Sequence, residues 1–134
     1  MIVVDTNIIG YLYLTGDRSP QAEQALLKDS LWSAPLLWRS ELRNVLALYL
    51  RRGLLRLDEA QQIMSQAAHL MHGREFLVTS HQVLSLVERS TCSAYDCEFV
   101  ALAQDLGIPL VTTDKQILDQ FPETAIPLEA YLSR

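Results

Sequence analysis

The stretch IVVDTN, residues 2–7, opens the chain with three apolar β-branched residues that are followed directly by an acid. A short run of this kind is typical of a buried parallel strand, and the polar residues after it are typical of the turn into a helix. The stretch LVTTD, residues 110–114, repeats the arrangement near the other end of the chain. We therefore expect two strands of one sheet, each with an acid at its carboxyl end.

Strand and helix patterns alternate between these two stretches. Strands are expected at residues 2–4, 31–34, 75–78, 108–112 and 125–126, and helices at 7–14, 19–28, 36–52, 57–71, 80–89, 94–106 and 115–120, with a last helical turn or two at 128–132. Alternation of this kind implies parallel pairing through right-handed crossovers. The prediction is an α/β fold, rich in helix, with a central parallel sheet of four to five short strands flanked by about seven helices.

Length and composition indicate one globular domain that spans residues 1–134. Apolar residues make up 49% of the chain and charged residues 20%, which is ordinary for a folded protein with a core. The acid in MIVVDTN interrupts any secretory apolar segment, and no stretch approaches the roughly 18 apolar residues of a membrane span. We expect a soluble, cytoplasmic protein.

Four acids stand at the edges of apolar segments, and they are Asp5, Glu41, Asp96 and Asp114. A doubly wound sheet binds ligands at the carboxyl ends of its strands, so acids placed there tend to meet in one crevice. At about 4 Å and an effective dielectric near 20, each pair of carboxylates costs roughly 4 kcal/mol. A cation would relieve that repulsion, and oxygen-only ligands favour Mg²⁺ or Mn²⁺. Phosphodiester hydrolysis is therefore the leading hypothesis.

Each acid also has a simpler interpretation. Asp5 and Asp114 could cap the helices that follow them, and Asp96 occupies the acid position of a capping box that begins at Ser93. Glu41 lies at the border of an apolar helix stripe, where a glutamate is usually solvated. The metal hypothesis therefore rests on the four acids as a set.

Two neutral residues are candidates for the same site as the four acids, whereas three further acids are not. Asn7 and Thr112 could orient carboxylates or bind metal-bound water, although turn and strand-end hydrogen bonds would explain them equally well. Surface charge is the expected role of Glu98, Asp105 and Asp119.

The net charge of −5 is unusual for an enzyme that acts on nucleic acid, because phosphate contacts normally come from lysine and arginine. Bound divalent cations would cancel part of that charge. Five arginines also gather around Glu41, within residues 39–56, where they could contact phosphates or form a solvated helix face.

The two cysteines, Cys92 and Cys97, do not match a zinc-binding spacing, and neither do the three histidines. We expect two reduced, packed cysteines, with no disulfide and no zinc.

Taken in order along the chain, the four acidic motifs resemble the PIN-domain ribonucleases. The motifs are VVDTN around Asp5, SEL-x2-VL around Glu41, YDCEFVALA around Asp96 and PLVTTD at Asp114. Within that family the chain looks most like the toxins of VapBC-type toxin–antitoxin modules, and the likeness runs from Met1 to about residue 119. Carried over motif by motif, the four acids match the family's catalytic and metal-binding acids, Thr112 matches its hydroxyl residue, and Asn7 its small polar residue.

The resemblance implies an endoribonuclease that cleaves single-stranded RNA with Mg²⁺ or Mn²⁺, forms a homodimer and is covered by a small antitoxin. The leucine-rich segments 36–50 and 57–71 independently predict an interface, because Leu46, Leu48 and Leu50 cannot all face one core. A second copy and an antitoxin peptide are the expected partners, with no membrane.

Two other functions fit parts of the pattern. A phosphatase or phosphotransferase could use Asp5 as nucleophile, but the haloacid-dehalogenase pattern requires an aspartate where this chain has Asn7. A non-catalytic module that binds RNA or a peptide would use the acids only as helix caps, and its binding would not depend on a divalent metal.

Overall fold

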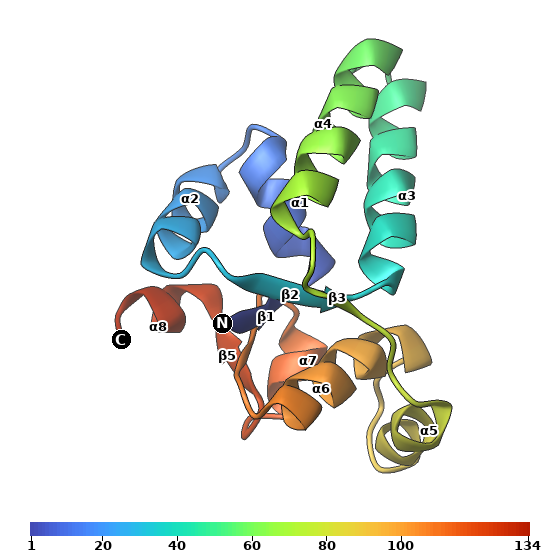
Figure 1. Ribbon diagram of the computed structural model, residues 1–134, viewed down its shortest axis with the longest axis vertical. Helices are drawn as coiled ribbons and strands as arrows, with labels where there is room; N and C mark the ends of the chain where they lie inside the picture. Colours follow the sequence, from blue (N-terminus) through green and yellow to red (C-terminus); the bar gives the residue numbers. More distant parts are fainter.

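The computed structural model describes all residues from Met1 to Arg134 and contains one five-stranded parallel sheet in the order β3-β2-β1-β4-β5 (Figure 1). The strands are β1 (Ile2–Val4), β2 (Trp32–Pro35), β3 (Glu75–Phe76), β4 (Leu110–Thr112) and β5 (Ala125–Pro127). The helices are α1 (Thr6–Tyr13), α2 (Ser19–Lys28), α3 (Leu37–Arg51), α4 (Leu57–Leu70), α5 (Ser80–Glu88), α6 (Ala94–Leu106), α7 (Lys115–Gln120) and α8 (Leu128–Leu132).

Strand β1 lies at the centre of the sheet because its three residues are apolar on both faces. Val3 pairs with Ser33 of β2 on one side and with Leu110 of β4 on the other. All three residues of β1 are buried. A parallel strand covered by helices on both faces needs such an uninterrupted apolar run.

Helices cover both faces of the sheet, with α1, α3 and α4 on one face and α5, α6 and α7 on the other (Figure 1). Helix α6 is buried along its middle and contacts β1, β2 and β4. The largest buried side chains, among them Trp32, Trp38 and Phe99, belong to one continuous core. No helix is long and apolar enough to span a membrane.

Helices α3 and α4 form a hairpin that projects beyond the sheet (Figure 1). Gly53 has a φ of +69°, a left-handed conformation that suits glycine at the end of a helix. Glu59 then closes the start of α4, because its Oε1 accepts a hydrogen bond of 2.9 Å from the backbone N–H of Arg56.

The α/β prediction is confirmed, and the boundaries differ where backbone hydrogen bonds compete. Strand β4 begins at Leu110 instead of 108, because the N–H of Ile108 donates to Ala103 and Pro109 has no N–H. Strand β3 contains only two residues, and Leu77 after it is 85% exposed. Residues 128–132 form a complete short helix, so there are eight helices where about seven were expected.

Candidate metal-binding active site

The structure brings the four predicted acids together in one cavity of about 300 Å³ at the carboxyl edge of the sheet. Asp5 follows β1 and Asp114 follows β4, and these two strands are neighbours. Asp96 lies in the first turn of α6, and Glu41 lies in the second turn of α3. We call this space the acid cavity; its other lining residues are Thr6, Asn7, Asn44 and Val45.

Asp5 is held by a side chain of the neighbouring strand β4. The Oγ1 of Thr112 donates a hydrogen bond of 2.7 Å to Oδ2 of Asp5, and it accepts one of 3.0 Å from the backbone N–H of Asp114. Asp5 is 9% exposed, and its side chain makes no cap hydrogen bond to α1. Asp5 occupies the N-cap position of α1, and Thr112 has the orienting contact that the sequence suggested.

Glu41 is held by Thr6, a residue for which the sequence predicted no role. The Oγ1 of Thr6 donates a hydrogen bond of 2.7 Å to Oε1 of Glu41, and Thr6 is only 4% exposed. Asn7, the predicted partner, is exposed and makes no side-chain hydrogen bond. The difference arises from the start of α1, where the first residue turns inward and the second turns toward solvent.

The remaining two acids differ in what they do for their helices. The Oδ1 of Asp114 caps α7 by accepting hydrogen bonds of 2.9 and 3.1 Å from Gln116 and Ile117. The cap interpretation of Asp114 therefore holds alongside its place in the cavity. Helix α6 is capped by Ser93, whose Oγ accepts from the backbone N–H of Asp96 at 3.1 Å. The Asp96 carboxylate is half-buried beside the other acids.

Burial and mutual repulsion disfavour the charged form of these acids. Burial raises the pKa of Asp5, and the nearby charges of Asp114 and Asp96 raise it further, while the Thr112 hydrogen bond lowers it. Burial also raises the pKa of Glu41 and Asp96, to which neighbouring acids add. The cavity therefore carries unfavourable negative charge when all four groups are ionised.

No lysine or arginine lines the acid cavity. Arg39 instead makes a paired hydrogen bond to Glu75, with Nε at 2.5 Å and Nη2 at 2.8 Å, and Trp38 donates to the same carboxylate. The Arg56 side chain contacts Asp58. The arginines that gather around Glu41 in the sequence therefore do not line the acid cavity, and Arg39 among them ties α3 to β3.

The donor set of the cavity fits a hard divalent cation. It consists of four carboxylates, two neutral amides and a threonine hydroxyl, with no cationic side chain. No three acidic, histidine or cysteine side chains meet in metal-ligand geometry in this arrangement. Oδ2 of Asp5 and Oε1 of Glu41 are directed at threonine hydroxyls instead. A bound cation would offset the repulsion that these residues otherwise experience.

Two more residues near the acids were not predicted to belong to this site. Asn44 lines the cavity one helical turn after Glu41, and that spacing of three is the pattern that could have revealed it. Glu98 was expected to be a surface charge, but it is half-buried and its charge raises the pKa of Glu41. Its approach depends on how α3 and α6 are placed at the edge of the sheet, which no local pattern encodes.

The Thr6–Glu41 hydrogen bond leads to a prediction about titration. Burial raises the pKa of Glu41, and the hydrogen bond from Thr6 lowers it because it stabilises the charged form. Thr6→Val removes the donor, so the Glu41 pKa should rise further, whereas Thr6→Ser keeps the hydroxyl and should leave it near the parent value. Carboxyl-carbon NMR titration of metal-free protein measures this. Equal titration curves for Thr6→Val and the parent would contradict the assigned contact.

The raised pKa of Asp96 leads to a prediction about stability. A carboxyl whose folded pKa is raised contributes stability that is fully present below its unfolded pKa, about 3.9, and is lost as pH rises through the folded pKa. Asp96→Asn removes this loss. In chelator, the melting temperature of the variant minus that of the parent should therefore increase as pH rises from about 4 to neutral.

Because the comparison is a difference, the titration of groups that do not interact with Asp96 cancels. Asp5 and Glu41 do interact with it, and their release from its charge adds to the expected increase. A difference that stays constant with pH, or that falls, would show that Asp96 does not experience the repulsion described above.

Comparison with known proteins agrees with this geometry. A family model described as "PIN domain" matches residues 2–124. Ribonuclease VapC3 from Pyrobaculum aerophilum is 31% identical over 129 residues, which cover 94% of this chain and 98% of that protein.

Two solved structures have the same fold. PAE2754 from Pyrobaculum aerophilum has a TM-score of 0.74 at 23% identity, with 99% of this chain and 94% of that chain covered. A chain in a toxin–antitoxin complex from Klebsiella pneumoniae has a TM-score of 0.71 at 18% identity, with 96% and 98% covered. The predicted resemblance is confirmed: the chain belongs to the PIN-domain family, and within it to the VapC-like proteins.

Proposed function

We propose that this chain is the ribonuclease toxin of a toxin–antitoxin module and that it hydrolyses single-stranded RNA with Mg²⁺ or Mn²⁺. The observation that carries the proposal is the acid cavity, in which four carboxylates gather with no cationic side chain among them. Family membership supports the ribonuclease activity, since the similar protein from Pyrobaculum aerophilum is named a ribonuclease.

Asp5, Asp96 and Asp114 would hold the metal ion, with Glu41 completing the set. A bound Mg²⁺ or Mn²⁺ supplies Lewis acidity for attack on a phosphodiester. Thr112 fixes one oxygen of Asp5 and Thr6 fixes one oxygen of Glu41, so both carboxylates are oriented before substrate arrives.

Glu41 is suited to receive a proton during hydrolysis. Its Oε1 is occupied by Thr6, while Oε2 makes no hydrogen bond and can accept the proton of the attacking water. Burial raises the pKa of this carboxyl, which makes it a stronger base than a solvated glutamate. Asn7 and Asn44 are the two amide side chains of the cavity and would donate to oxygens of the substrate.

A separate hollow could receive the proposed antitoxin partner. The hollow measures about 870 Å³ and lies between the end of α1 and the α3–α4 hairpin, where Leu14, Tyr49, Leu55 and Ile63 provide apolar walls. Such a surface suits an apolar peptide segment. The structural neighbour from Klebsiella pneumoniae belongs to a toxin–antitoxin complex, which supports a partner of this kind.

The proposed homodimer is supported by an apolar patch that includes Leu36 but otherwise lies outside the two predicted segments. On α3, Leu46 is buried and Leu50 half-buried, which leaves mainly Leu48 on the surface. A larger patch surrounds a hollow of about 330 Å³ at the start of α5, with Leu77 85% and Leu84 62% exposed. An exposed apolar patch of this kind usually marks an interface.

The central test of the function is metal-dependent cleavage. Purified protein should cleave a single-stranded RNA in Mg²⁺ or Mn²⁺ and stop in excess chelator, because the acids alone supply no positive charge. Asp96→Asn should lower the rate at least roughly 10-fold, as expected when a metal shell is disrupted. Asp105→Asn, an exposed acid farther along α6, is the matched control and should cleave like the parent.

Cleavage that persists in chelator, once contaminating nuclease is excluded, would contradict the proposal. An acid-labile phosphoenzyme on Asp5 would instead favour the phosphotransferase alternative.

The dimer is tested by light scattering at micromolar concentration. The parent should have about twice the 15.2 kDa mass of one chain. Leu77→Asp should give the single-chain mass because it puts a charge into the patch, whereas Leu27→Asp, which changes an 88% exposed leucine on α2, should remain dimeric. A parent that scatters as a single chain would contradict the dimer.

A further inference from the structure

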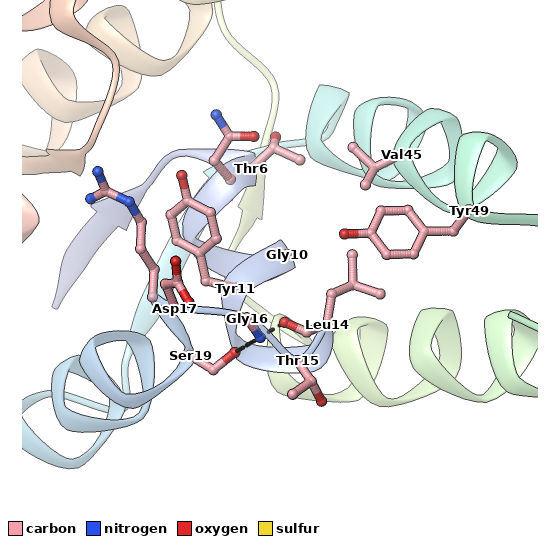
Figure 2. Close-up of a pocket in the computed structure, with 12 residues that line it drawn as sticks. Thr6, Gly10, Tyr11, Leu14, Thr15, Gly16, Asp17, Ser19, Val45 and Tyr49 are labelled. Carbon is pink, nitrogen blue, oxygen red and sulfur yellow. Dashed lines mark hydrogen bonds between the residues drawn. The ribbon is translucent and has the colours of Figure 1, made fainter. Parts of the chain in front are cut away.

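A second pocket opens directly beside the acid cavity. It has a volume of about 320 Å³ and lies between α1, the loop that leads to α2, and α3 (Figure 2). It shares three lining residues with the acid cavity, which are Thr6, Asn7 and Val45. A substrate strand whose phosphate lies at the acids would therefore have the mouth of this side pocket next to it.

The walls of the side pocket are aromatic on two sides. Tyr11 of α1 and Tyr49 of α3 lie on opposite sides of the space in Figure 2, and the Tyr49 hydroxyl points into it. Gly10 leaves room between them, because a Cβ added at that position would meet no atom within 4 Å. The pocket thus has room for a flat group, with the Tyr11 ring on one side and the Tyr49 hydroxyl on the other.

The rim of the side pocket carries polar groups that have no partner within the chain. Asn7, Asp17 and Arg18 make no side-chain hydrogen bond or ion pair, and neither does the Tyr49 hydroxyl. The Arg18 guanidinium lies 5.8 Å from the centre of the Tyr11 ring. Arg18 is also the one cationic side chain that lines either of the two cavities.

We propose that the side pocket is a nucleobase subsite, which receives a base next to the cleaved phosphate. This inference rests on the proposed ribonuclease function and extends it. Single-stranded RNA is recognised by stacking of bases on aromatic and arginine planes and by hydrogen bonds to base edges, and the side pocket offers both. Arg18 would also attract the strand to a site whose acids repel phosphate.

The composition of the side pocket favours a base over an apolar peptide side chain. Only four of its twelve lining residues are hydrophobic, and two of those four are tyrosines. An apolar side chain would leave the unpaired polar groups of the rim without partners, whereas a base carries donors and acceptors at its edge.

Two variants remove the pocket in opposite ways. Gly10→Leu puts a side chain into the pocket, starting from a Cβ position that has no atom within 4 Å, and Tyr49→Ala removes one wall. Leu48→Ala is the matched control, because Leu48 precedes Tyr49 on the same helix but lies outside the pocket. Melting curves establish that each variant folds before it is assayed.

The first measurement uses a random-sequence pool of single-stranded RNA and sequences the cleaved ends. The parent and Leu48→Ala should show a base preference at one position beside the cleaved bond. Gly10→Leu and Tyr49→Ala should lose that preference and raise KM roughly five-fold or more, with a smaller change in kcat, as expected when stacking of one base is lost. An unchanged preference and KM in both variants would overturn the proposal.

The second measurement separates the subsite from the hydrolysis. In an Asp96→Asn background, fluorescence anisotropy measures binding of a labelled single-stranded RNA without depending on cleavage. Gly10→Leu should weaken that binding roughly five-fold or more, and Leu48→Ala should not. If the parent proves inactive but this dependence is seen, the proposed hydrolysis fails while the subsite stands.

Equal RNA binding by Gly10→Leu and Leu48→Ala would overturn the subsite, even if the parent cleaves RNA. Loss of binding to an antitoxin peptide alone, with RNA binding unchanged, would identify the pocket as a peptide site and would also overturn the proposal.

Discussion

The pairing of β1 with β4 is the constraint on which the site depends. Val3 aligns with Leu110 and Val4 with Val111, and the N–H of Asp5 donates to the carbonyl of Val111. This register brings Thr112 to the Asp5 carboxylate. It also fixes where β4 ends, and therefore where Asp114 lies. A one-residue slip would turn every side chain of the strand to the opposite face. The buried apolar residues of β1 therefore fix the register, and with it the position of Asp5.

The same edge of the sheet concentrates charge that the fold does not neutralise. Arg39 is bound to Glu75, and no cationic side chain reaches the acids. The neutral donors Thr6 and Thr112 hold two of the carboxylates in place without removing their charge. The hydrogen bonds therefore orient the carboxylates, but their negative charge stays unbalanced. A divalent cation that binds there stabilises the folded state.

The positions of β1 and β4 and the convergence of the acids could be predicted because they follow from local patterns. An apolar strand followed by an acid specifies a sheet edge at Asp5 and at Asp114. These two motifs, together with the helical motifs around Glu41 and Asp96, identified the family. The roles of Thr6 and Glu98 could not be predicted, since both depend on how a helix is rotated against its neighbours. The side pocket between Tyr11 and Tyr49 likewise depends on the spacing of α1 and α3, which is set by packing across the whole core.

Metal-dependent melting shows whether the four acids form one cluster that requires a cation. With Mn²⁺, the melting temperature of the parent should rise above its value in chelator, because an ion that binds only the folded state stabilises it. Asp96→Asn should melt higher than the parent in chelator but gain much less from Mn²⁺, while Asp105→Asn should behave like the parent in both conditions. If Asp96→Asn melts lower than the parent in chelator and gains as much from Mn²⁺, then Asp96 is only a helix-start acid and the claim is contradicted.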